Sequence, residues 1–174
     1  MALYKDGAIV DDPWRSTMAG DDANPPLAGG VILSLGDWRA FRESARTGEN
    51  SLYAVRIEPG EDIDAIVPDL SRLSLIALPF PKFADGRSFS KARMLRDTHS
   101  FQGEIRAVGD VLWDQLQLMR RCGFDAFEIE HEPTLKALRG GKKPFMSDFY
   151  QPGEGPETRD GAPRQRAWAR RSLA

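Results

Sequence analysis

Short apolar runs alternate with longer segments of helical periodicity from residue 31 onward. The runs are VILSL, LYAVRI, LIALPF, EIRAV and DAFEIE, and each has the composition of a buried strand. The segments between them are long enough to hold helices, so successive strands are expected to lie parallel with right-handed connections. The pattern predicts an α/β fold of repeated βα units around a mostly parallel sheet, which is either an open three-layer sheet or a partial barrel.

The two ends of the chain lack this alternation. In residues 1–28 an Asp-Gly pair separates two short apolar stretches, which predicts a small hairpin followed by a loop. Residues 29–152 are then expected to form one α/β domain. Residues 153–174 are rich in Gly, Pro and Arg and have no sustained apolar face, which predicts disorder. The alternative is a short cationic segment around Trp168 that docks on a partner.

Helix boundaries follow from periodicity and from capping residues. Apolar side chains recur at helical spacing over residues 112–122, and Gly123 can take the left-handed conformation that ends a helix. A second helix is predicted over residues 63–73. Asp62 is placed to cap this helix, and Pro68 allows a break inside it.

Composition bounds the class of protein. The chain has 174 residues, 41% apolar and 29% charged, with a formal net charge of −2, which fits one globular domain and gives no sign of nucleic-acid binding. The single cysteine, Cys122, excludes an internal disulfide framework and any multi-cysteine metal site. No apolar run approaches the roughly 20 residues that span a bilayer. We therefore expect a cytoplasmic protein.

Candidate chemistry follows from a rule of parallel sheets, in which ligands bind at the carboxyl ends of the strands. Charged and turn-forming residues follow several predicted strands and are expected to converge on one edge of the sheet. They are Arg56, Glu58, Lys82, Asp85, Arg87, Gly109, Asp110, Glu128 and Glu130.

The segment PFPKFADGRSFSKARMLRD suggests an anion- or partner-binding loop. If residues 75–80 form a strand and residues 90–99 a helix, the loop between them ends at Ser88 or Ser90, either of which is a plausible N-cap. The free N–H groups of the helix would then lie between two basic side chains of this loop. Such a site suits an oxyanion or a carboxylate of a partner.

The basic side chains of this loop are Lys82 and Arg87. The alternative is that Asp85 and Arg87 form a surface ion pair while Lys82 is merely solvated. Arg93 and Arg96 either extend the basic face or, as we favour, belong to a solvated helix surface.

A second set of candidates surrounds the run GEIRAVGDV. Gly109 allows a sharp turn at the end of a strand. Asp110 either caps the next helix, which we favour, or contributes to ligand binding or to orienting a neighbouring arginine. Arg106 lies inside the strand and is expected to pair with an acid such as Glu128. Gln115 either helps to fix this network or is exposed.

No catalytic constellation stands out. His99 and His131 lack the neighbours of a metal site, so no metal is predicted, and Cys122 is expected to be a buried structural thiol. A redox reaction would require a cofactor, which the sequence does not identify, because one cysteine cannot cycle as an internal disulfide. Catalytic and cofactor-binding residues therefore stay unassigned.

The runs FPKFADGRSFSKARMLRD, GEIRAVGDVLWDQLQLMRRCGFDAFEI and KDGAIVDDPW resemble a bacterial family of proteins known as a domain of unknown function, number 934 in that series. The resemblance covers roughly residues 3–152. This family is described as a candidate oxidoreductase or accessory protein of sulfite reduction, because its members are encoded beside the haem-protein subunit of sulfite reductase.

The resemblance implies an accessory protein in assimilatory sulfite reduction, with the haem-protein subunit of sulfite reductase as its partner. Lys82, Asp85, Arg87, Ser90, Arg106 and Asp110 are the expected anion- or partner-binding residues. The alternative is an enzyme that uses a flavin, or proton transfer with Asp110 or Glu128 as base, on a small phosphorylated or sulfonated substrate.

Overall fold

The computed structural model describes residues 1–16, 30–43 and 53–144. Its strands form one open eight-stranded sheet in the order β2-β1-β8-β7-β6-β5-β4-β3. The strands are β1 (Ala2–Lys5), β2 (Ala8–Val10), β3 (Arg15–Ser16), β4 (Val31–Ser34), β5 (Tyr53–Arg56), β6 (Leu73–Phe80), β7 (Glu104–Gly109) and β8 (Ala126–Ile129).

The predicted α/β fold with a mostly parallel sheet is confirmed. Strands β3 to β8 pair in parallel, whereas β1 pairs antiparallel with β8 and with β2. The predicted hairpin is β1 and β2, and it turns at Asp6 and Gly7, which both have positive φ angles. This hairpin extends the sheet along the edge of β8.

The helices are α1 (Leu35–Phe41), the 3-10 helices η1 (Ile63–Ala65) and η2 (Val67–Arg72), α2 (Arg87–Asp97), α3 (Leu116–Arg121) and α4 (Glu132–Arg139). The helix predicted over residues 63–73 is therefore two 3-10 helices, separated at Ile66 just before Pro68. Asp62 caps the first of them as predicted, by accepting a hydrogen bond from the Asp64 amide. Gly123 follows α3 with a φ of +102°, also as predicted.

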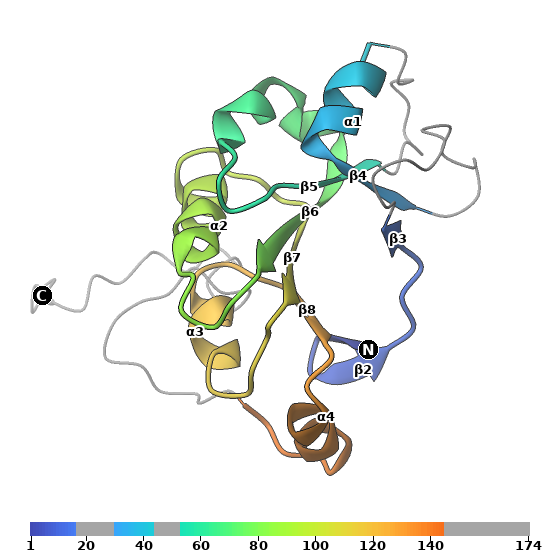
Figure 1. Ribbon diagram of the computed structural model, residues 1–174, viewed down its shortest axis with the longest axis vertical. Helices are drawn as coiled ribbons and strands as arrows, with labels where there is room; N and C mark the ends of the chain where they lie inside the picture. The colour runs from blue at the N-terminus through green and yellow to red at the C-terminus, as the bar shows by residue number, and fades with distance from the viewer. Residues whose placement is uncertain (17–29, 44–52, 145–174) are drawn as a thin grey trace, which may run out of the picture.

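The described helices cover one face of the sheet. Strands β4 to β8 lie in the sheet in chain order, so each right-handed connection steps the same way and places its helix on the same side. The main core joins that face to helix residues, and Figure 1 shows α2 and α3 together beside it. The helix residues include Trp38, Ile63, Leu95, Met119 and Leu135.

The opposite face carries smaller side chains and has no described helix on it. Its apolar cluster is Ile32, Ala54, Leu75, Ala77 and Val108, with Trp14 packed against it. The ring of Trp14 lies over Gly30, where a Cβ atom would come within 2.1 Å of the ring.

The sheet is strongly curled around this helix-free face. Strands β2 and β3 are its two edges, yet only residues 11–14 join them. Five residue steps span at most about 18 Å, whereas seven strand spacings would measure about 34 Å across a flat sheet. The edges must therefore approach each other, as in a partial barrel, and Figure 1 shows the joining segment passing on the side away from α2 and α3. We call residues 11–14 the strap.

Within the described residues, no helix combines the length and the apolar character needed to cross a membrane.

Candidate functional site

Strands β6, β7 and β8 end side by side at the carboxyl edge of the sheet. Phe80 pairs with Gly109, and the Asp110 amide donates a hydrogen bond of 2.8 Å to the Phe80 carbonyl. A cavity of about 450 Å³ opens there, and its polar side chains are two acids and a histidine. It is lined by Phe80, Pro81, Gly109, Asp110, Val111, Glu130 and His131. The edge is thus acidic at this point, and Lys82 and Arg87 do not line the cavity.

The loop between β6 and α2, residues 81–86, is held by contacts at its centre and at its C-terminal end. The Gln115 side chain is buried and donates a hydrogen bond of 3.2 Å to the Phe83 carbonyl. Arg87 donates from Nε and Nη2 to the two carboxylate oxygens of Asp85, at 2.9 and 2.7 Å. This contact lowers the pKa of the Asp85 carboxyl to about 2. The surface ion pair of Asp85 with Arg87 is therefore present, and the anion- or partner-binding role of this loop stays a prediction.

The predicted serine cap of α2 is wrong. The helix begins at Arg87 rather than at residue 90, and its N-cap is Gly86. The Asp85 carboxylate accepts a hydrogen bond from the Arg87 amide and so caps the first turn in place of a serine hydroxyl. Ser88 is buried and donates to the Pro79 carbonyl at 2.6 Å, whereas Ser90 is exposed. The serine at the end of a loop is used here to tie the helix to its own strand.

Asp110 does not cap a helix either, since α3 begins at Leu116 with Gln115 as its N-cap. The turn predicted at Gly109 is present, with a φ of +92°. A Cβ atom at this position would lie 2.7 Å from the Phe80 carbonyl oxygen, so glycine is required both by the backbone conformation and by the close approach of β6. Asp110 is exposed at the wall of the cavity.

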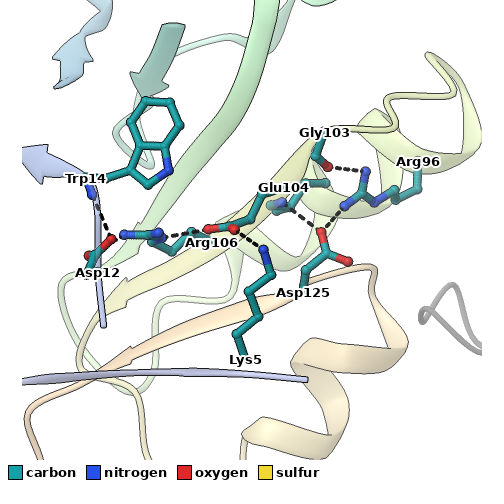
Figure 2. A network of polar contacts seen from close by, with 9 residues as sticks. Lys5, Asp12, Trp14, Arg96, Gly103, Glu104, Arg106 and Asp125 are labelled. Atoms are coloured by element: carbon teal, nitrogen blue, oxygen red, sulfur yellow. Dashed lines mark hydrogen bonds and ion pairs between the residues drawn. The ribbon is translucent and has the colours of Figure 1, made fainter. Parts of the chain in front are cut away.

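Arg106 is buried on the helix-free face and does not reach the carboxyl edge. It pairs with acids, as expected, but its partners are Asp12 and Glu104 rather than Glu128. Nη1 donates to Asp12 at 2.6 Å and Nε to Glu104 at 2.9 Å. Figure 2 shows these contacts as one chain that Lys5 continues, with a bond of 2.7 Å to Glu104.

Arg96 forms a second buried contact that the sequence did not indicate. The solvated surface expected for Arg93 and Arg96 is present only at Arg93, because Arg96 turns inward between α2 and the start of β8. Its guanidinium donates to the carbonyls of Phe101, Gly103 and Gly123 and to the Asp125 carboxylate. The same carboxylate accepts a hydrogen bond from the Ile105 amide (Figure 2).

Lys91 makes a third buried contact that the sequence did not indicate. It is buried in the first half of α2, and its Nζ donates to the carbonyls of Glu58 and Glu61, both at 2.5 Å. Burial lowers the pKa of this lysine, while Glu61 opposes the shift. The contact fastens the segment after β5 to α2 and so positions the carboxyl edge.

Glu128 lies on the helix-free face of β8 and is half-buried. Within the described residues no hydrogen bond or ion pair reaches its carboxylate. Burial raises the pKa of this carboxyl, and the nearby charges of Asp12 and Glu130 add to the shift while Arg106 opposes it. An unpaired carboxyl with a raised pKa is typical of a functional site.

Replacing Glu128 by glutamine is expected to raise the melting temperature at pH 7. The carboxyl binds its proton more tightly in the folded than in the unfolded chain, so its contribution to stability is present at low pH and is lost as the pH rises above the unfolded pKa. Thermal unfolding at pH 4 and pH 7 checks this, because the gain should disappear at pH 4. Glu43→Gln, at an exposed acid, is the charge-matched control. A lower melting temperature for Glu128→Gln at pH 7 would contradict the raised pKa.

The structure thus leaves the anion- or partner-binding role of the six predicted residues as a prediction. It places Lys82, Asp85, Arg87 and Ser90 on the loop and first turn of α2, Asp110 at the cavity, and Arg106 inside the curled sheet. No cluster of three or more His, Cys, Asp or Glu side chains suited to a metal ion occurs within residues 1–16, 30–43 and 53–144.

Comparison with known proteins identifies a family. A search of curated proteins finds no match, and a search of solved structures finds none either. The profile of a family described as "Bacterial protein of unknown function (DUF934)" matches residues 54–158, which include β6 to β8, all but the first residue of β5, and the cavity. The resemblance seen in the sequence covers roughly residues 3–152, so the profile match starts about 50 residues later and ends a few residues later. The chain belongs to the DUF934 family of bacterial proteins.

Proposed function

We propose that this protein is a cytoplasmic accessory protein of assimilatory sulfite reduction, which docks on the haem-protein subunit of sulfite reductase through the loop between β6 and α2. The observation that carries the docking surface is Phe83, which is 51% exposed at the centre of this loop. The pathway and the partner come from the family resemblance described above.

A large exposed aromatic side chain on a fixed backbone is suited to anchor a partner. The Gln115 hydrogen bond to the Phe83 carbonyl and the ion pair of Asp85 with Arg87 order this loop before any partner arrives. A preordered loop loses little conformational entropy on binding, and aromatic and arginine side chains dominate the energy of many interfaces. Lys82 and Arg87 flank the anchor and would favour acidic groups of the partner.

A pull-down from cells growing on sulfate as sole sulfur source tests the proposal. The tagged wild-type protein is expected to retain the haem-protein subunit of sulfite reductase, and Phe83→Ser to lower the retained amount at least about tenfold. Met94→Ser and Leu118→Ser are matched controls, because these side chains are 44% and 49% exposed on α2 and α3. Equal retention by all three variants would exclude the loop, and no retention by the wild type would exclude the partner.

Glu128 supports a second candidate, an enzyme that transfers a proton to or from a small anionic substrate. Its unpaired carboxyl, with a pKa raised by burial, lies inside the curled sheet. Glu128 is two residues before Glu130, which lines the cavity. A carboxyl with a raised pKa can serve as general acid or base. A flavin absorption band in the purified protein would favour the flavin-dependent form of this candidate over the accessory role.

A further inference from the structure

The strap crosses the inside of the curled sheet. Strand β2 runs in the same direction as β8, with β1 between them. Its last residue, Val10, lies at the level of Glu128, since Val10 and Glu128 both oppose Leu3 of β1. Strand β3 begins at the opposite edge, because Arg15 pairs with Val31 at the start of β4. The strap therefore descends across the helix-free face from the carboxyl end of the strands to their amino end, and Asp12 lies at the level of Arg106.

The contact between Asp12 and Arg106 has the geometry of a bound carboxylate. Arg106 is only 1% exposed, and its Nη1 donates to one carboxylate oxygen of Asp12 at 2.6 Å. The other oxygen accepts a hydrogen bond of 3.0 Å from the Trp14 amide. Figure 2 shows the carboxylate between the guanidinium and this amide. The Trp14 amide belongs to the strap, so the bond open to an external carboxylate is the charge-assisted one from the buried Arg106 guanidinium.

The two acids that contact Arg106 are held in different ways. Glu104 lies two residues away on the same strand and is also bound by Lys5, so it is part of the sheet. Asp12 is brought from 94 residues away by a four-residue strap, and 22% of its side chain stays exposed. The Asp12 carboxylate is therefore reached by solvent and is held in place through the strap. Glu104 is held by residues of the sheet and does not need the strap.

Charge also favours an anion at this place. Without Asp12, Arg106 would keep Glu104 as its one ion-pair partner within the described residues, and Lys5 shares that carboxylate. Glu128 is close enough for the charge of Arg106 to lower its pKa, but burial raises that pKa by more, so Glu128 compensates poorly for a missing carboxylate. A buried excess of positive charge is costly, and a monovalent anion would relieve it.

We propose that Arg106 is the binding group of a site for a small carboxylate ligand inside the curled sheet, and that Asp12 occupies this site as an internal substitute for the ligand. A ligand that displaces Asp12 frees the strap and Trp14 from the helix-free face. Because Asp12 is tethered, it competes at an effective concentration in the millimolar range, so an external carboxylate binds the wild-type protein weakly. The site is separate from the docking loop and does not rest on the function proposed above.

The test removes the internal carboxylate and supplies an external one. Asp12→Ala is titrated with sodium formate, and its melting temperature is followed, with sodium chloride at equal ionic strength as reference. At ten times its dissociation constant, formate should raise the melting temperature of Asp12→Ala by roughly 3–6 °C in a saturable manner. The wild type and Asp11→Ala, which changes the exposed neighbouring acid of the strap, should show no saturable rise.

Two further variants test whether formate binds at Arg106, and a third covers the case in which Asp12→Ala does not fold. In the Asp12→Ala background, Arg106→Met should abolish the effect of formate. Glu128→Gln should preserve the effect, and this variant rules out that the Glu128 carboxylate pairs with Arg106 in place of Asp12. If Asp12→Ala is unfolded in buffer, recovery of folded protein on adding formate is the expected result, and Asp12→Asn is titrated in parallel. The proposal is overturned if formate acts no better than chloride on all Asp12 variants, or if its effect survives Arg106→Met.

Discussion

Replacing Arg96 by alanine is expected to lower the free energy of unfolding by about 3–5 kcal/mol, the range found when one partner of a buried ion pair is removed. The guanidinium satisfies the Asp125 carboxylate and the carbonyls of Phe101, Gly103 and Gly123. These groups come from the loop before β7 and the turn before β8, so the substitution loosens two connections at once. Urea unfolding of the purified variant measures the loss.

Arg93→Ala is the matched control for this experiment. Arg93 lies on the same helix, has the same side chain and is exposed, so its loss should change the free energy of unfolding by less than about 0.5 kcal/mol. Similar losses for the two variants would mean that the buried contacts of Arg96 contribute little, and the structural role assigned to this residue would be wrong.

Gly109→Ala is expected to destabilise the protein and to distort the cavity at the carboxyl edge. The left-handed backbone alone costs a residue other than glycine about 1–3 kcal/mol. The added Cβ atom would also lie 2.7 Å from the Phe80 carbonyl oxygen, which is backbone and cannot rotate away. The ends of β6 and β7 must then separate, which weakens the hydrogen bond from the Asp110 amide to Phe80.

Gly141→Ala separates the two causes. Gly141 also has a positive φ, of +76°, but nothing lies within 4 Å of the position of its Cβ atom. This variant therefore carries the conformational cost without the clash, and thermal unfolding should show a smaller drop in melting temperature than for Gly109→Ala. Equal drops would show that β6 and β7 move apart without cost, and that the edge is not rigid.

The strands could be predicted because buried parallel strands appear as continuous apolar runs. The runs VILSL, LYAVRI, LIALPF, EIRAV and DAFEIE each coincide with all or most of one strand of the parallel sheet, and the Asp-Gly pair marks the hairpin. Helix starts were predicted less well. The first amide of α2 donates to the Asp85 carboxylate, whereas the Ser88 hydroxyl donates to the Pro79 carbonyl instead of capping the helix. Several side chains can satisfy the same amide, and local sequence does not choose among them.

The polar contacts inside the protein could not be predicted in the same way. Arg96 has the spacing of a solvated helix residue, and only the proximity of Gly103, Gly123 and Asp125 makes it a buried one. The only local signal at Asp125 is a glycine and an aspartate just before a strand, and this pair is equally typical of an ordinary turn. Similarly, nothing near Arg106 in the sequence names Asp12 as its partner.

Periodicity and turn residues, which act over a few positions, were thus enough for β4 to β8, the parallel arrangement and the N-terminal hairpin of this protein. They did not predict β3, which lies where a loop was expected. The curl of the sheet, the acidic lining of the cavity and the pairing of Arg106 with Asp12 depend on residues up to 94 positions apart. A short strap between the two edge strands imposes that curl, and the curl brings Asp12 against β7. Such contacts follow from how the chain closes in space, which no local pattern of residues encodes.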